Sequence, residues 1–72
     1  MRLKEIREDL DITQTELADY LCIKQNTYSQ YENGQRLIPL ELLIKLARYY
    51  NTSTDYILGL TDEKTPYPAS RK

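Results

Sequence analysis

The sequence lacks the residues that metal and thiol chemistry require. Its 72 residues include no histidine and a single cysteine, Cys22. One cysteine forms no internal disulfide, and without histidine the chain offers no cluster of zinc ligands. There is also no Gly-rich phosphate loop, no convincing pair of carboxylates and no setting that marks Cys22 as a reactive thiol. We therefore expect no metal site, no cofactor and no enzyme activity.

Long apolar runs and an excess of positive charge are missing as well. No run approaches the roughly 18 apolar residues of a membrane span, and the opening MRLKEIREDL has no apolar stretch typical of a signal peptide. We therefore expect a cytoplasmic protein without membrane contact. The net charge of −1 and the pI near 5.3 count against nucleic-acid binding, which usually relies on an excess of lysine and arginine. Between positions 20 and 40, however, the only acid is Glu32, against Lys24 and Arg36.

The rest of the composition is that of an ordinary globular protein. Apolar residues make up 40% of the chain and charged residues 29%, which argues against disorder and allows one domain with a modest core. The segment TDEKTPYPASRK contains two prolines and no apolar period. We therefore predict a domain over residues 1–60 and a flexible tail over residues 61–72. No alternation typical of strands and no internal repeat occurs.

Helical spacing predicts two helices at the start of the domain. The first spans residues 2–10, and the positions spaced to face its core side are Leu3, Ile6 and Leu10. The second begins after Thr13, an N-cap residue that is followed three positions later by Glu16, and it runs to about Leu21. Ile12 precedes this cap in the position of a hydrophobic staple. The expected core residues of the second helix are Leu17, Ala18 and Leu21.

A third helix is predicted over residues 25–32, after a turn at Cys22. Gly34 follows its end, because glycine readily adopts the left-handed conformation found there. Tyr28 and Tyr31 are spaced to face the core. The opposite side is polar, uncharged and rich in amides, and its members are Gln25, Asn26, Ser29, Gln30 and Asn33.

Two further helices complete the expected fold. Pro39 suits the first position of a fourth helix, which continues to about Tyr50 and can be closed by Asn51. Ser53 can cap a short fifth helix that Gly59 ends. This region has more apolar residues than one core-facing stripe requires, and the surplus comprises Leu42, Ile44 and Leu60. The surplus hints at a dimer surface, although it could instead cover the core.

The middle of the chain has the pattern of a helix-turn-helix. Two short helices joined by a tight turn, the second with an amide face, form the geometry that places a recognition helix in the major groove of DNA. The sequence resembles the phage repressor and Cro helix-turn-helix domains, also called the XRE family. The resemblance covers residues 3–60, and its most specific parts are TQTELADYL and the triplet ENG with a proline five residues after its glycine. The matching residues are Arg7, Gln14, Leu17, Ala18, Leu21, Ile23, Thr27, Tyr31, Glu32, Asn33, Gly34, Pro39, Leu43, Ala47 and Leu58.

The resemblance implies an all-α fold, a compact bundle of five short helices of the lambda-repressor-like type, with the helix-turn-helix at helices two and three. It also implies a sequence-specific transcriptional regulator, most simply a repressor, which reads a double-stranded DNA operator through its third helix as a homodimer. Two alternatives use the same fold. One is a protein-binding adaptor that has lost DNA binding, and the other is an antitoxin whose tail engages a protein partner.

Amide side chains are the candidate base readers. Asn and Gln can form paired hydrogen bonds with the N6 and N7 edge of adenine. Gln25, Asn26 and Gln30 stand where the resembling repressors have their base readers, and Ser29 is a weaker candidate. Without that context, amides on a helix surface are more simply explained as solvated side chains.

Phosphate contacts are expected around the same two helices. The free N–H groups at the start of the second helix, beside Thr13 and Gln14, can hold a phosphate. Lys24 and Arg36 flank the third helix, and each could equally be a solubilising charge. Two further candidates are Thr27, which could touch a phosphate or a base, and Asn33, to which the resemblance assigns a phosphate contact.

The resemblance also assigns contacts within the protein. Glu32 on a DNA-binding face would repel phosphates, and in similar proteins an arginine of the first helix pairs with this glutamate. Arg7 and Glu32 are therefore expected to form a structural ion pair, and Gln14 is expected to brace Gln25.

Some residues depart from the usual pattern or invite another reading. Cys22 stands where the family usually has a left-handed glycine, and Lys24 stands where a serine cap is common.

The chain has seven tyrosines and no other aromatic residue, a composition that could stack on unpaired bases. We favour core packing for the three at core spacing, which are Tyr28, Tyr31 and Tyr50.

Overall fold

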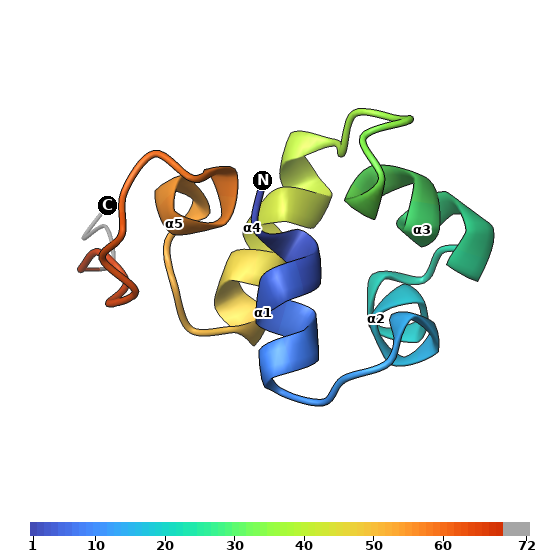
Figure 1. The fold of residues 1–72 in the computed structure, drawn as a ribbon, viewed down its shortest axis with the longest axis horizontal. Coiled ribbons are helices and arrows are strands. Elements are labelled where there is room, and N and C mark those ends of the chain that lie inside the picture. The colour runs from blue at the N-terminus through green and yellow to red at the C-terminus, as the bar shows by residue number, and fades with distance from the viewer. Residues whose placement is uncertain (69–72) are drawn as a thin grey trace.

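The computed structural model describes residues 1–68, which fold into helices joined by short loops (Figure 1). The helices are α1 (Leu3–Asp9), α2 (Gln14–Leu21), α3 (Gln25–Glu32), α4 (Leu40–Tyr49) and α5 (Thr54–Leu58). Within residues 1–68 there is no strand, and no helix has both the length and the apolar character needed to cross a bilayer. The prediction of an all-α bundle of five short helices is confirmed. Along the longest axis of the molecule, α2 and α3 form one end and α5 lies toward the other (Figure 1).

Side-chain caps begin two of the helices. The Thr13 hydroxyl accepts a hydrogen bond from the Glu16 N–H at 3.1 Å, and the Ser53 hydroxyl accepts one from the Tyr56 N–H at 3.0 Å. Both were expected from the sequence, because a cap depends on residues only three positions apart. At the start of α3, Lys24 makes no such bond. The first turn of α3 therefore has no side-chain cap.

Left-handed residues end or follow the helices where the sequence indicated. Cys22 is the C-cap of α2 with φ 58°, and Gly59 is the C-cap of α5 with φ 84°. Asn51 and Gly34, which follow α4 and α3, have φ 53° and 75°. The turn conformation at Cys22 is thus the one expected of a glycine, although a side chain in this conformation costs about 1 to 2 kcal/mol.

Two details of the prediction are wrong. Pro39 precedes α4 with an extended backbone, φ −61° and ψ 145°, and the helix begins one residue later. Leu10 is 56% exposed because α1 ends at Asp9, so that Leu10 follows the helix as its C-cap instead of facing the core. Of the apolar surplus, for which a dimer surface and the core were both open, Leu42 packs against the core.

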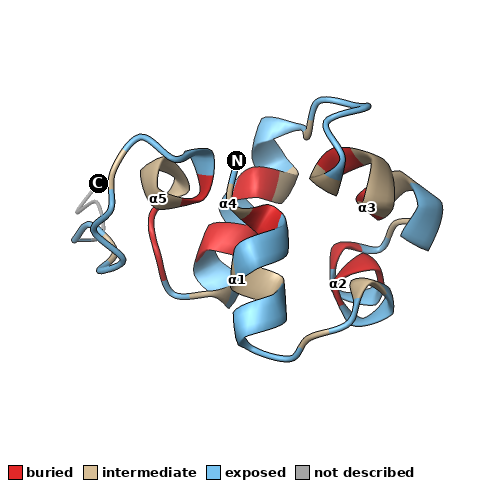
Figure 2. Ribbon diagram, viewed as in Figure 1, coloured by how far each residue is buried: buried red, intermediate tan, exposed pale blue. Residues whose placement is uncertain are grey.

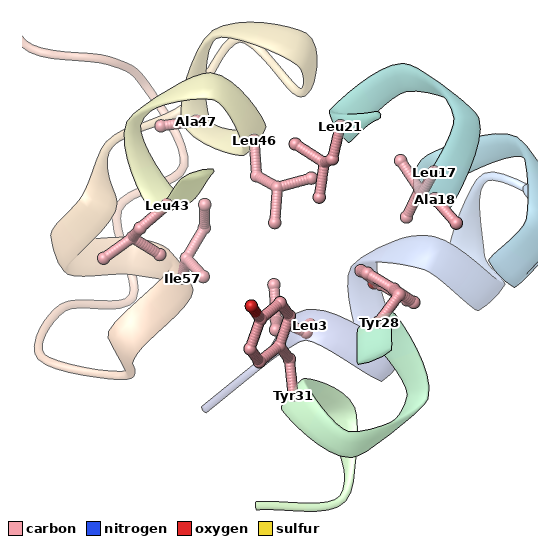
Figure 3. Packing of buried hydrophobic residues seen from close by; sticks show 10 residues of the cluster. All are labelled: Leu3, Leu17, Ala18, Leu21, Tyr28, Tyr31, Leu43, Leu46, Ala47 and Ile57. Carbon is pink, nitrogen blue, oxygen red and sulfur yellow. The ribbon is translucent and has the colours of Figure 1, made fainter. Parts of the chain in front are cut away.

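The core lies where the five helices meet, and each helix contributes to it (Figures 2 and 3). Tyr28 is fully buried, Tyr31 is nearly so, and Tyr50 packs against the cluster from its edge. The expected core packing of these tyrosines is therefore confirmed, and their rings are not available to stack on unpaired bases. The buried apolar residues are Leu3, Leu17, Ala18, Leu21, Tyr28, Tyr31, Leu43, Leu46, Ala47 and Ile57.

The segment after α5 returns to the domain. The Arg2 guanidinium donates to the Asp62 carboxylate at 2.7 Å, and the Thr52 hydroxyl donates to the Lys64 carbonyl at 2.6 Å. The expected flexible tail thus begins with a segment that is hydrogen-bonded to the body of the protein. Its last four residues, 69–72, lie outside the described residues.

Candidate nucleic-acid interface

α2 and α3 form a helix-turn-helix whose turn is set by Cys22. After this left-handed residue, the Ile23 N–H donates back to the Ala18 carbonyl at 3.0 Å. The two helices pack closely on each other, with Leu17 of α2 and Tyr28 of α3 fully buried. Because these side chains point into the core, the opposite side of α3 faces solvent at one end of the molecule (Figure 1).

The outward side of α3 is polar and carries no charge. Its members are Gln25 and Asn26, which are exposed, and Thr27, Ser29 and Gln30, which are half-buried. Just beyond the helix, the exposed Asn33 donates its side-chain N–H to the Ser29 hydroxyl at 3.5 Å. The one charged residue of α3, Glu32, has a side chain only 1% exposed. The structure thus brings the candidate base readers onto one helix face, with the single charge turned inward.

A shallow open hollow lies beside the start of α2 and reaches the first residue of α3. Thr13 satisfies the N–H of Glu16, while the N–H groups of Gln14 and Thr15 have no partner within the helix. N–H groups in this position attract anions. The residues that line the hollow are Arg7, Glu8, Asp11, Ile12, Thr13, Gln14, Thr15 and Gln25. Two acids are among them, so this is a polar site and not a strongly positive one.

The structure corrects the expected partner of Gln25. The amide nitrogen of Gln14 donates to Glu32 Oε1 at 3.1 Å, because a buried carboxylate is a stronger acceptor than an exposed amide. The side chain bonded to Gln25 is instead Thr15, whose hydroxyl donates to Gln25 Oε1 at 3.1 Å. Thr15 was not among the site residues expected from the sequence, since nothing in the local pattern separates it from any other threonine on a helix surface.

Lys24 and Arg36 lie on either side of α3, and both are exposed. No carboxylate of residues 1–68 is within ion-pair distance of either one. Their charges are therefore not neutralised inside the described part of the protein. They remain open to an anionic partner or to solvent.

Arg7 and Glu32 form an ion pair that joins α1 to the end of α3. Arg7 Nε lies 2.6 Å from Glu32 Oε2, and Arg7 Nη2 donates to Oε1 at 3.3 Å. Arg7 Nη1 also donates to the Ile12 carbonyl at 2.9 Å. The side chains are 13% and 1% exposed. With the bond from Gln14, the buried carboxylate connects α1, α2 and α3.

The surroundings of Glu32 keep it charged. Burial acts to raise the pKa of Glu32, but the hydrogen bonds from Arg7 and Gln14 and the positive charge of Arg7 outweigh burial, so this pKa lies below the ordinary value of a carboxyl group. The hydrogen bond to Glu32 likewise raises the pKa of Arg7. Burial raises the pKa of the Tyr28 hydroxyl far above its usual range. The pair is therefore ionised at neutral pH and holds its charges away from the outward face of α3.

Residues 1–68 contain no group of three His, Cys, Asp or Glu side chains arranged to hold a metal ion. The fold, with α3 packed on α2 after a tight turn, is that of a helix-turn-helix domain. The helix-turn-helix family matches residues 3–57, and the chain belongs to this family, in its XRE-type form.

Curated relatives carry names of transcriptional regulators. The chain is 42% identical over 65 residues to the uncharacterized HTH-type transcriptional regulator YobD of Bacillus subtilis, covering 90% of this chain and 58% of YobD. It is 47% identical over 58 residues to the HTH-type transcriptional regulator ImmR of the same organism, covering 81% of this chain and 46% of ImmR.

A phage repressor is also similar. The chain is 36% identical over 64 residues to the cryptic phage CTXphi transcriptional repressor RstR of Vibrio cholerae, covering 86% of this chain and 57% of RstR. The chain thus spans about half the length of these relatives. No solved structure matches the chain at a significant level.

Proposed function

We propose that this chain is the DNA-binding part of a cytoplasmic transcriptional regulator, a repressor that reads a double-stranded operator through α3. The observation that supports this most is the exposed, uncharged amide face of α3, carried by a helix-turn-helix. The regulator and repressor names of the relatives agree with it. The buried position of Glu32 removes the objection that an acid of α3 would repel the phosphates, because the side chain is turned away from the outward face.

In this proposal α3 enters the major groove, where Gln25, Asn26 and Gln30 contact base edges and Ser29 supports them. An amide presents one donor group and one acceptor, which together match N7 and N6 of adenine. The half-site is therefore expected to contain A·T pairs at the positions that these side chains reach.

Neutral groups supply much of the proposed phosphate contact. The start of α2, at Thr13 and Gln14, offers N–H groups to one phosphate, while Thr27 and Asn33 reach others with a hydroxyl and an amide. These groups suit a chain whose net charge is −1. Because neutral donors release few counterions, we expect a weaker dependence of affinity on salt than for strongly basic domains.

Selection of binders from a random duplex library, with purified chain at moderate salt, tests the proposal. The expected result is an enriched two-fold symmetric motif. The same library in single-stranded form is the control, and it should enrich nothing, because the proposed base contacts require the major groove of a duplex. Absence of any enriched duplex motif, even at low salt, would overturn the proposal and favour a protein-binding role for this fold.

Lys24→Ala and Arg36→Ala should each weaken binding to all duplexes alike. Each change should lower the slope of log affinity against log salt concentration by about 1, since each removes one phosphate contact. The measurement is a salt titration of affinity on the selected operator and on a scrambled duplex. Lys64→Ala is the matched control, because this lysine belongs to the segment after α5, and that segment lies at the end of the molecule away from α2 and α3 (Figure 1). An unchanged slope would identify the charge as a solubilising one.

We further propose that two copies bind the operator. Ile44 is 37% exposed and Leu60 is 73% exposed, and a homodimer interface typically buries apolar side chains of this kind. Half-sites are then expected about one helical turn apart. Sedimentation velocity with and without the selected operator measures the state directly. A single copy of the chain under both conditions, at concentrations that saturate the operator, contradicts the dimer.

A further inference from the structure

We propose that Thr15 is a positioning residue that sets the base preference of Gln25. This inference rests on the proposed function and names a residue that acts through another. Thr15 is exposed near the start of α2, and Gln25 is exposed at the start of α3. The hydroxyl of Thr15 donates to Gln25 Oε1 at 3.1 Å and so links the first turns of the two helices.

Gln25 has little else to hold it. It is the first residue of α3, where the N-cap residue Lys24 provides no side-chain hydrogen bond. Gln14, the other amide near this position, is bonded to the buried Glu32. A glutamine side chain on a helix surface samples several rotamers, and ordering it on binding lowers affinity. Among the described residues, the hydroxyl of Thr15 is the group that restricts this sampling before DNA arrives.

The bond also determines how the amide is presented. With one lone pair of Oε1 occupied by Thr15, Gln25 keeps its NH₂ group and a second lone pair for an external partner. A donor beside an acceptor is the pattern that adenine complements through N7 and N6–H. Thr15 therefore favours the orientation in which Gln25 reads adenine, and it does so without touching the base.

The position of Thr15 couples base reading to the phosphate contact. Thr15, Gln25, Thr13 and Gln14 line the same open hollow, at the free N–H groups that begin α2. A phosphate seated at those groups would fix α2 on the backbone of one strand. The hydrogen bond from Thr15 then positions Gln25, the first base reader of α3, relative to that phosphate.

The test compares base preferences, position by position, for the full chain and for Thr15→Val, which keeps the shape of threonine and removes the hydroxyl. Duplex selection is run on both, on Gln25→Ala and on Thr15→Ser, which restores the hydroxyl. We expect Thr15→Val to lower the base preference at one position by about three- to tenfold, the range of one hydrogen bond. That position is the one whose preference Gln25→Ala abolishes, and Thr15→Ser should restore it.

Thermal unfolding separates this role from a structural one. Thr15→Val should leave the unfolding midpoint unchanged, since the side chain is exposed, and it should have no effect on base preference when Gln25 is already alanine. If Thr15→Val matches the wild type at every position, or weakens all positions equally, the inference is overturned. If the wild type itself enriches no motif, the proposed function has failed, and that result differs from both of these.

Discussion

Replacing Gln25, Asn26 and Gln30 with alanine lowers affinity for the selected operator by about a thousandfold. Each paired amide–base contact contributes about 1 to 3 kcal/mol of discrimination. A contact of about 1.4 kcal/mol changes affinity about tenfold, so three such contacts change it about a thousandfold. Affinity for a scrambled duplex should change little, because the phosphate contacts of the start of α2, Lys24 and Arg36 are untouched. Fluorescence anisotropy at one fixed salt concentration gives both affinities and their ratio.

The control for this triple variant is Gln35→Ala, which removes an exposed amide just outside α3. It should leave the ratio of specific to non-specific affinity unchanged. The core should also be unaffected in the triple variant, since the outward face of α3 does not contribute to the buried cluster. A triple variant that retains the wild-type ratio would mean that these amides are only solvated and that other residues read the operator.

Glu32→Ala should destabilise the domain by about 3 kcal/mol or more, because it leaves the guanidinium of Arg7 largely buried without its partner. A chain of this size has only about 4 to 11 kcal/mol of stability in total. Arg7→Ala should have a similar effect, since it leaves the buried carboxylate of Glu32 without its cationic partner. Urea unfolding followed by circular dichroism measures both changes.

The double variant Arg7→Met with Glu32→Leu separates the net stability that the ion pair contributes from the cost of leaving one buried charge unpaired. Replacing both partners by apolar side chains removes the unpaired charge, so it should cost less than either single change. A double variant less stable than both single variants would show that the pair itself contributes net stability. In either case DNA binding of the folded double variant reports whether the pair also orients α3.

The same pair predicts how stability depends on pH. The pKa of Glu32 is lower in the folded state than the ordinary value of about 4.3 for glutamate. Its stabilising contribution is therefore complete at neutral pH and is lost as the pH falls below that ordinary value and through the lower folded pKa. Unfolding free energies measured between pH 7 and pH 3 should fall on acidification, and the fall should be smaller for Glu32→Gln. Equal falls in the two proteins would assign the acid sensitivity to other carboxylates.

Features set by neighbours in the chain were predictable from the sequence. Thr13 and Ser53 cap their helices because each bond spans only three residues. The spacing of Tyr28 and Tyr31 determined which side of α3 is buried, and therefore which side carries the amides. The class of fold and the family followed from these local signals taken in order along the chain.

Contacts between side chains of different helices were decided by the tertiary structure. Gln14 and Thr15 are adjacent in sequence, yet the side chain of Gln14 donates to the buried Glu32 and that of Thr15 to Gln25. Leu10, expected in the core, is exposed at the end of α1, whereas Leu42, for which a dimer surface and the core were both open, packs on the core. Helix caps and spacing are short-range properties that one segment contains by itself. Which acceptor a polar side chain finds depends on where separate helices bring the competing groups, and no single segment carries that information.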